Sequence, residues 1–410
     1  MPTLAATPFT PVTHWPAVLA AAVAGVAVGM NVGKVPLALP LLRSELGLNL
    51  VQAGWVSAML TTLAVVAALG FGLAAGRIGA LRMVLGGLGL SAAASLLALA
   101  VPVDGGFPLL LATRFAEGAG FLAVAVAGPA LISAAAMPAD RRFALGVWAT
   151  YMPAGAGLAM GLSPLVLPNA GWRGLWLVTA GVLLLAMAAA WRQRTWYAPA
   201  GASGHAAAPG KALAVLCQPL PWLLALTFGM WAVQHFALIV WLPTFLKEQR
   251  GLSAGWVATL SCVMLLACVP GNLVGGALVQ RGLSRGRLVA LAHVLTGLCG
   301  LGFFSDALPD GLRYALCVAM SFIGGVIPAA VMSSSVVLAR NPRQINALQG
   351  VIMQGSQLGQ FVGTPLIATV VAASGRWGAA VWVTGGAAAL GVALGLAAWW
   401  VERRQVAAAN

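Results

Sequence analysis

The chain has 410 residues, of which 61% are hydrophobic and only 7% are charged, and its mean hydropathy is +0.95. This composition excludes a large soluble domain and is typical of an integral membrane protein. The net charge of +14 does not indicate nucleic-acid binding, because the cations lie mainly between apolar runs, where they set membrane orientation. The five cysteines and four histidines show no metal-ligand spacing, so we expect no metal, cofactor or disulfide framework.

Apolar runs of about 20 residues, the length that a membrane-spanning helix needs, recur along the whole chain. They predict an all-α integral membrane protein with twelve transmembrane helices. The first six are expected at 16–41, 52–76, 82–101, 108–136, 143–168 and 172–191, and the second six at 220–243, 255–280, 287–306, 311–337, 345–372 and 377–400.

The distribution of Lys and Arg predicts the orientation of these helices. Twelve spans place both termini on one side, and that side and its loops carry fourteen cations, against seven on the other side and at span ends. Because cytoplasmic loops are enriched in Lys and Arg, we expect both termini in the cytoplasm. Arg114 is counted here with the span ends.

Two halves are expected, because sequence segments recur at an offset of roughly 200 residues, as in transporters with internal repeats. QAGWVSAML at 52–60 returns as SAGWVATLS at 253–261. The predicted organisation is a six-helix bundle over 1–191, a cytoplasmic linker over 192–219 that is rich in Ala, Pro, Gly and Ser, and a second six-helix bundle over 220–410.

Three short motifs resemble those of the major facilitator superfamily. Gly72 to Gly79 is similar to the GxxxDRxGRR loop, Gly276 to Arg281 is similar to its echo in the second half, and Arg114-Phe-Ala-Glu117-Gly118 is similar to RxxxG. The resemblance covers the whole chain and implies two pseudo-symmetric bundles, transport by alternating access, and gating loops at Arg77 and Arg281. Gly76 and Gln280 stand where the loop motif has an acidic residue.

Within that superfamily, two segments resemble the cyanate permease family: ALIVWLPTFL at 237–246 and MQGSQLGQFVGTPL at 353–366. The first-helix Asn-x-Arg-Pro pattern of that family is met only as Asn31-Val-Gly-Lys34-Val-Pro36. The family's substrate is therefore not carried over. We expect the protein in the inner (cytoplasmic) membrane of a bacterium.

Lys34 is the most informative residue, because a cation inside an apolar span is costly unless it meets water, a partner or a ligand. One interpretation is that Lys34 attracts an anionic substrate, with Asn31 one turn earlier donating a hydrogen bond. The other is that the Lys34 side chain extends outward to the membrane surface near the end of its span.

Further polar residues are candidates for the same substrate site. Alignment of Pro243 with Pro40 places Gln234 opposite Asn31, and His235 and Trp231 lie beside Gln234 on the seventh span. A buried neutral histidine and ordinary packing are the alternatives for His235 and Trp231. The remaining candidates are Tyr151 in the fifth span and Gln354 and Gln357 in the eleventh. In the eleventh span Gln354, Gln357 and Gln360 form a polar stripe, which either lines the cavity or hydrogen-bonds another helix.

Arg114 and Glu117 lie one turn apart on the fourth span, where they can neutralise each other. Either they form a static ion pair at the helix entrance, or Glu117 takes up a proton and couples transport to a proton gradient.

These observations predict a secondary transporter for a small anion, such as a carboxylate or cyanate, coupled to protons by symport. It is expected to act as a monomer. The alternative is an exporter of hydrophobic or drug-like compounds. No catalytic dyad or phosphate loop is visible, so we do not expect an enzyme.

Overall fold

The computed structural model describes residues 12–138, 140, 144, 145, 147, 148, 150–197, 217–338 and 342–409. The described part is helical. The helices of the first half are α1 (Trp15–Leu46), α2 (Leu50–Ile78), α3 (Ala80–Leu97), α4 (Phe107–Ala135) and α6 (Tyr151–Arg192), with short 3-10 turns η1 (Ala98–Ala100) and η2 (Arg194–Tyr197).

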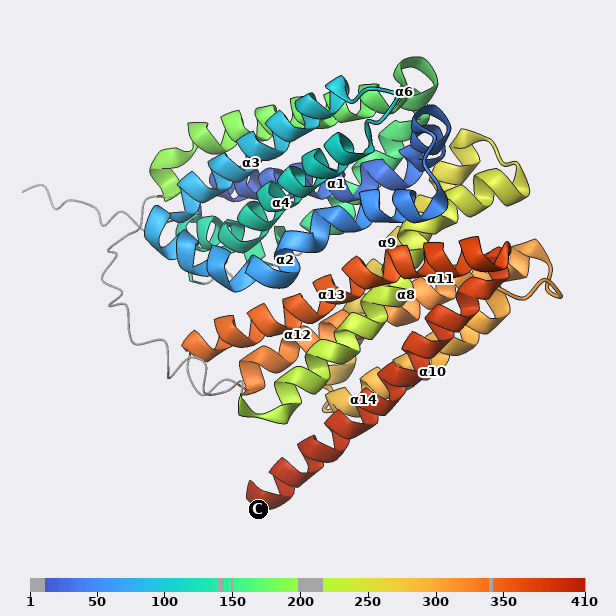
Figure 1. The fold of residues 1–410 in the computed structure, drawn as a ribbon. Helices are drawn as coiled ribbons and strands as arrows, with labels where there is room; N and C mark the ends of the chain where they lie inside the picture. Colours follow the sequence, from blue (N-terminus) through green and yellow to red (C-terminus); the bar gives the residue numbers. More distant parts are fainter. Residues whose placement is uncertain are drawn as a thin grey trace, which may run out of the picture.

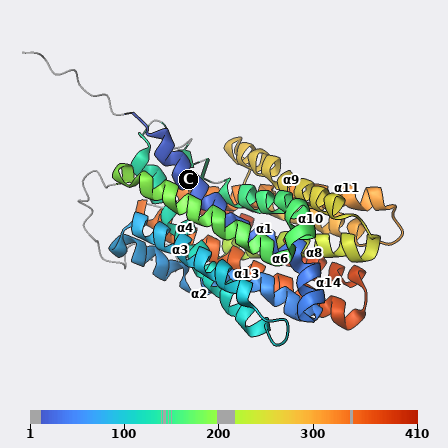
Figure 2. The same cartoon turned by 90° about the horizontal axis from the view of Figure 1, so that it is seen from above.

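Seven α-helices and one short 3-10 turn are described in the second half. They are α8 (Pro219–Arg250), α9 (Ala254–Gln280), α10 (Arg285–Phe303), α11 (Asp310–Gly324), α12 (Val326–Leu338), α13 (Pro342–Ser374), η4 (Trp377–Ala379) and α14 (Ala380–Ala409). Figure 1 draws the first half, in blue to green, largely above the second half, in yellow to red, and Figure 2 shows the same long helices from above.

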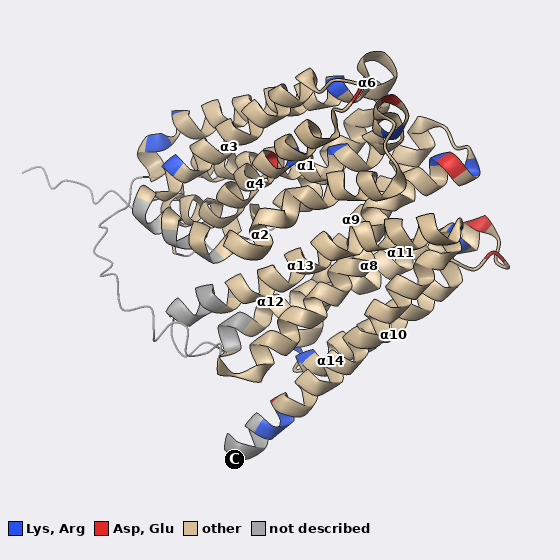
Figure 3. Cartoon of the chain, in the orientation of Figure 1, with Lys and Arg blue, Asp and Glu red and all other residues tan. Residues whose placement is uncertain are grey.

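Ten stretches of the described residues are long and apolar enough to cross a membrane. Figure 3 agrees with this picture, since Lys, Arg, Asp and Glu gather toward the ends of the helices and most of the helical length carries none of them. The expected all-helical membrane fold is therefore confirmed, but the count of twelve is not reached by these ten stretches.

Several helices extend beyond the predicted spans, and α1 continues to Leu46 and α8 to Arg250. The boundary predicted between the spans 143–168 and 172–191 falls at Gly171, where α6 is broken; the Gly171 φ of 59° and ψ of −166° are accessible only to glycine. The span predicted at 311–337 is divided at Gly325 into α11 and α12. The linker expected over 192–219 is described only to Tyr197 and from Cys217, and its remaining residues lie outside the described part.

Small residues let α1 and α6 approach closely in the first half. Gly25, Gly29 and Gly33 follow one another at four-residue spacing along α1, and a Cβ added at Gly33 would lie only 2.6 Å from the Cα of Ala156. Gly155 likewise contacts the backbone of Val26 and Gly29. Small residues at every fourth position are a common way to pack helices in lipid, where backbone contact replaces the hydrophobic effect.

The two halves meet at the end where α1 and α8 finish. One apolar cluster there joins Leu39 and Leu42 of α1 to Trp241 of α8 and Ile367 of α13. The Arg43 guanidinium of the first half pairs with the Glu248 carboxylate of the second at 2.5 Å. The two halves are therefore closed against each other at this end.

Candidate functional site

Lys34 lies in the interior of the first half. Its side chain is fully buried, and α1 continues for about 18 Å beyond it to Leu46, at the helical rise of 1.5 Å per residue. The Lys34 ammonium donates to Glu117 Oε1 at 2.6 Å and to Ser95 Oγ at 3.0 Å. The interpretation that Lys34 extends outward to the membrane surface is therefore wrong. Helix α1 is longer than the predicted span, and Glu117, the partner of Lys34, lies inside the bundle.

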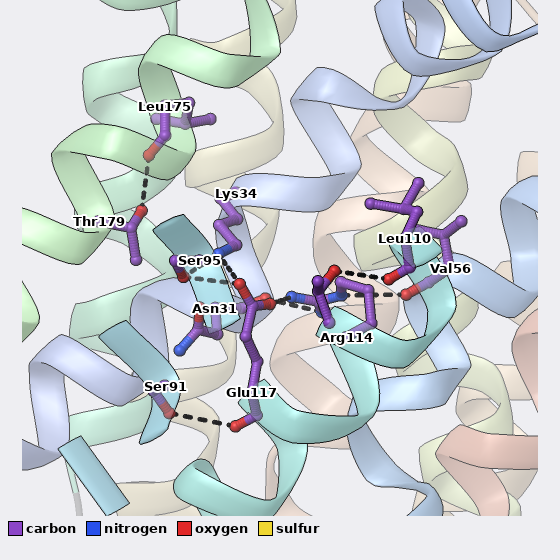
Figure 4. Close-up of polar contacts among 11 residues, drawn as sticks. Asn31, Lys34, Val56, Ser91, Ser95, Leu110, Arg114, Glu117, Leu175 and Thr179 are labelled. Carbon is purple, nitrogen blue, oxygen red and sulfur yellow. Dashed lines mark hydrogen bonds and ion pairs between the residues drawn. The ribbon is translucent and has the colours of Figure 1, made fainter. Parts of the chain in front are cut away.

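Glu117 is shared between two cations. Its Oε1 accepts from Lys34 and from Ser95 Oγ at 2.6 Å, while its Oε2 pairs with the Arg114 guanidinium. Figure 4 shows Lys34 and Arg114 reaching Glu117 from two directions. We call Lys34, Arg114 and Glu117 the buried triad. With all three groups ionised, it carries one net positive charge.

Backbone carbonyls of two other helices hold Arg114 in place. Its Nε donates to the Val56 carbonyl of α2 at 3.1 Å, and its Nη2 donates to the Asn31 carbonyl of α1 at 3.0 Å. Only 1% of Arg114 is exposed. The pair of Arg114 and Glu117 predicted from the sequence is confirmed, but its expected place at the helix entrance is wrong, because α4 is covered here by α1, α2 and α3.

Two contacts around the triad have no signal in the sequence. The ammonium of Lys34 lies over the ring of Trp176 at 4.4 Å from its centroid, a cation–π contact from α6. The hydroxyl of Ser91 on α3 donates to the Glu117 carbonyl at 3.2 Å. Serine and tryptophan are common in membrane helices, so neither residue stands out without the packing of α3, α4 and α6.

A small pocket lies between the two halves, and Arg114 is part of its wall. The first half contributes Val32, Val35, Ser57, Leu60, Thr61 and Arg114, and the second half contributes Phe236, Val240, Gln360 and Thr364. Its lining therefore combines one cation, an amide, three hydroxyls and an aromatic ring. The Ser57 hydroxyl and the side-chain amide of Asn31 are buried without a hydrogen-bond partner among the described residues.

The predicted polar residues of α8 form a second cluster inside the second half. Gln234 Nε2 lies 3.2 Å from His293 Nδ1 of α10, and His293 Nε2 lies 3.3 Å from the Thr227 carbonyl. The rings of Trp231 and His235 stack at 4.8 Å. The sequence did not indicate His293, because a lone histidine in an apolar helix has no local partner.

The other predicted site residues are dispersed. Tyr151 is half-buried at the start of α6, where its ring stacks on Trp148 at 4.9 Å. On α13, Gln354 and Gln357 are half-buried, and the member of the stripe in the pocket wall is Gln360. Gln360 therefore belongs to the predicted polar stripe, and it lies beside pocket residues of the first half.

Of the two predicted gating arginines, the structure describes only one side chain. Arg281 is exposed directly after α9, whereas the side chain of Arg77, near the end of α2, lies outside the described residues. Among the described residues, no group of three His, Cys, Asp or Glu side chains is placed to hold a metal ion.

The family model described as Major Facilitator Superfamily matches residues 18–364. The chain belongs to this superfamily. The predicted superfamily is thus confirmed, and with it the prediction that the chain is a transporter and not an enzyme. The narrower resemblance to the cyanate permease family stays a prediction.

Two curated relatives show what this chain is similar to. The 3-(3-hydroxy-phenyl)propionate transporter of Escherichia coli (strain K12) is 27% identical over 338 residues, which cover 77% of this chain and 80% of the relative. The voltage-gated purine nucleotide uniporter SLC17A9 of Mus musculus is 29% identical over 151 residues, 36% of this chain. The match spans only 33% of the mouse protein's own length.

Solved structures share the fold. A crystal structure of a bacterial homologue of the human lysosomal transporter Spinster, inward-facing and unoccupied, gives a TM-score of 0.76 at 15% identity, covering 94% of this chain and 95% of that chain. The inward-facing and occupied form gives a TM-score of 0.77 at 13% identity and covers 97% of this chain and 98% of that chain. At these identities the similarity supports the fold alone.

Proposed function

We propose that this protein is a secondary transporter for a small organic anion, which binds in the pocket between the two halves. The observation that carries the proposal is the buried triad, whose net positive charge reaches the pocket through Arg114. A buried charge is costly, and an anionic ligand would offset that cost. A positive site disfavours the alternative substrates of the sequence prediction, hydrophobic or cationic compounds.

The hydrogen-bonding groups around the pocket support a carboxylate. Charge-assisted hydrogen bonds from guanidinium to carboxylate are short and strong, and Arg is well shaped for them. The unpaired hydroxyl of Ser57 and the amide of Gln360 offer further hydrogen bonds, and Phe236 offers an apolar wall. The curated relatives are named for an aromatic propionate and for purine nucleotides, both of which are organic anions. In this proposal Arg114 is the main substrate contact. The other predicted contacts have a smaller part in binding, and they are Asn31, Gln234, His235, Trp231, Tyr151, Gln354 and Gln357.

The proposed topology has twelve membrane crossings. A helix of 42 residues such as α6 is about 63 Å long, roughly twice the hydrocarbon thickness, so it would cross twice about Gly171. The 33 residues of α13 would provide one further crossing. We further propose bundles over 1–191 and 220–410 joined by a cytoplasmic linker, a monomeric protein with cytoplasmic termini, and a bacterial inner membrane. Arg77 and Arg281 would act in the gating loops.

Proton symport through Glu117 is the proposed mode of coupling. Glu117 is a buried carboxylate beside the cation that would meet the substrate, so protonating it would change how tightly Arg114 is held. A proton taken up at Glu117 on one side of the membrane would then be released on the other, together with the substrate.

The test is transport by purified protein in liposomes, with labelled 3-(3-hydroxyphenyl)propionate as the first probe and phthalate as the second. Arg114→Gln should weaken the apparent affinity by about tenfold to a hundredfold, because a charge-assisted hydrogen bond contributes about 1.5–3 kcal/mol. The control is Arg313→Gln, which removes the buried arginine of the second half that pairs with Asp306. Equal affinity in the two variants, or no transport of any anion by the parent protein, would overturn the proposal.

A further inference from the structure

The buried triad has one cation more than its carboxylate requires. Each oxygen of Glu117 has its own cation, with Lys34 on Oε1 and Arg114 on Oε2. Arg114 alone would neutralise Glu117. The positive charge of Lys34 therefore either has another role or lowers the stability of the folded protein. The inference below rests on the proposed function and concerns how many charges that function moves.

The two cations differ in what else they can reach. Arg114 is part of the pocket wall, whereas Lys34 points between α3, α4 and α6, toward Ser95 and the ring of Trp176. An anion that enters the pocket therefore meets Arg114 first. When Arg114 turns to the substrate, Lys34 remains on Glu117, and the carboxylate keeps a partner and stays ionised. A site with Arg114 alone would leave a buried carboxylate unpaired at that step, which is strongly unfavourable.

We propose that Lys34 sets the charge balance of transport, so that the proton symport proposed above applies to a divalent anion, whereas a monovalent anion crosses without a proton. With Glu117 ionised, the triad has one positive charge, and a monoanion makes the loaded site neutral. With Glu117 protonated, the triad has two positive charges, and a dianion makes it neutral. A neutral site is favoured in a low-dielectric interior, since electrostatic energies there are largest. The proton comes from water on the uptake side and returns to water on the release side.

Among the residues that the structure describes, the surroundings of Glu117 supply no other charge to this balance. From α3 it meets the hydroxyls of Ser95 and Ser91, and α2 and α1 supply the carbonyls of Val56 and Asn31 to Arg114. Trp176 of α6 contacts Lys34. Lys34 and Arg114 are the only ion-pair partners of Glu117 among the described residues. Lys34→Gln would therefore remove one charge and leave the Arg114 pair in place.

The experiment compares the parent protein, Lys34→Gln and Lys34→Arg in liposomes whose membrane potential is clamped at zero with valinomycin and potassium. The interior is one pH unit more alkaline than the exterior. The parent should accumulate phthalate, a dianion, about tenfold, but not 3-(3-hydroxyphenyl)propionate, because one pH unit is a tenfold driving force only for a proton-coupled anion. Lys34→Gln should show the reverse, with about tenfold accumulation of the monoanion and loss of dianion transport.

The controls separate this inference from the function on which it rests. Lys34→Arg keeps the charge and should behave as the parent does, and protein-free liposomes measure passive entry of the undissociated acid. If Lys34→Gln transports both anions with the same proton coupling as the parent, the charge-balance inference is wrong and the proposed function stands. If the parent transports neither anion, the proposed function itself fails. A thermal midpoint of Lys34→Gln close to that of Lys34→Arg shows that the variant is folded.

Discussion

At the scale of single residues, Glu117 is the side chain on which the first half depends most. It holds two buried cations that would otherwise face apolar surroundings. Glu117→Ala should therefore destabilise the protein by about 3–5 kcal/mol, the cost typical of leaving buried charges unpaired. The measurement is the thermal midpoint in detergent. The double variant Glu117→Ala with Lys34→Met should regain part of the lost stability, because it leaves one buried cation fewer without a partner.

The matched control for this prediction is Glu248→Ala, which breaks the partly exposed pair with Arg43. Exposed ion pairs contribute only about 0–1 kcal/mol, so this change should be small. Similar losses of stability in Glu117→Ala and Glu248→Ala would show that the triad does not stabilise the fold.

The residue scale also shows where sequence reasoning reaches its limit. The expected partners Arg114 and Glu117 share one helix turn, and that pair is present. Lys34 was recognisable as a cation in an apolar run, but its partner Glu117 is 83 residues away. Which helices are neighbours is a property of tertiary packing, and no local pattern in one sequence encodes it. The same reason hides the contact between Gln234 and His293.

At the scale of helices, α1 and α6 owe their close contact to glycine. A Cβ added at Gly155 of α6 would meet the α1 backbone, whereas one added at Gly161 of the same helix would meet nothing within 4 Å. Composition alone cannot separate the two positions, because the face of a helix that meets a neighbour depends on where that neighbour lies. The predicted boundary between 168 and 172 coincides with the break at Gly171 in α6, whereas the division at Gly325 between α11 and α12 was not predicted.

A substitution on the contacting face tests this packing. Gly33→Val would place a branched side chain against the backbone of Ala156 and push α1 away from α6. It should lower the free energy of unfolding by about 1–3 kcal/mol, which is the usual cost of overpacking. It should also weaken substrate affinity, because Lys34 is the next residue. The measurements are the thermal midpoint and the transport affinity.

The control on the same pair of helices is Gly181→Ala, at a position of α6 with open space around the added Cβ. Alanine in a helix reduces the freedom of the unfolded chain, so this variant should be as stable as the parent or gain up to about 1 kcal/mol. Equal stability of Gly33→Val and Gly181→Ala would mean that α1 and α6 are not held by backbone contact.

At the scale of the whole molecule, charge and closure distinguish the two ends of the bundle. The end where α1 and α8 finish has six cations (Arg43, Arg173, Lys247, Arg250, Arg313, Arg376) and five of the eight carboxylates (Glu45, Asp104, Glu248, Asp306, Asp310). Among the described residues, the opposite end has ten arginines and only Asp140 and Glu402 as acids. The pair of Arg43 and Glu248 joins the halves at the balanced end. In the proposed topology with cytoplasmic termini, this closed end would face away from the cytoplasm.

A reversible cross-link tests both the closure and the orientation. In Arg43→Cys combined with Glu248→Cys, with the five native cysteines replaced, a short bifunctional thiosulfonate should join the halves and stop transport in intact cells. Alternating access requires this end to open, and a fixed bridge prevents that opening. A membrane-impermeant reductant added outside should restore transport, because it reaches the bridge only if this end faces outward. Either single cysteine variant should transport normally after the same treatment. Full transport by the cross-linked protein would contradict a gate at this end, and recovery only in inside-out vesicles would reverse the orientation.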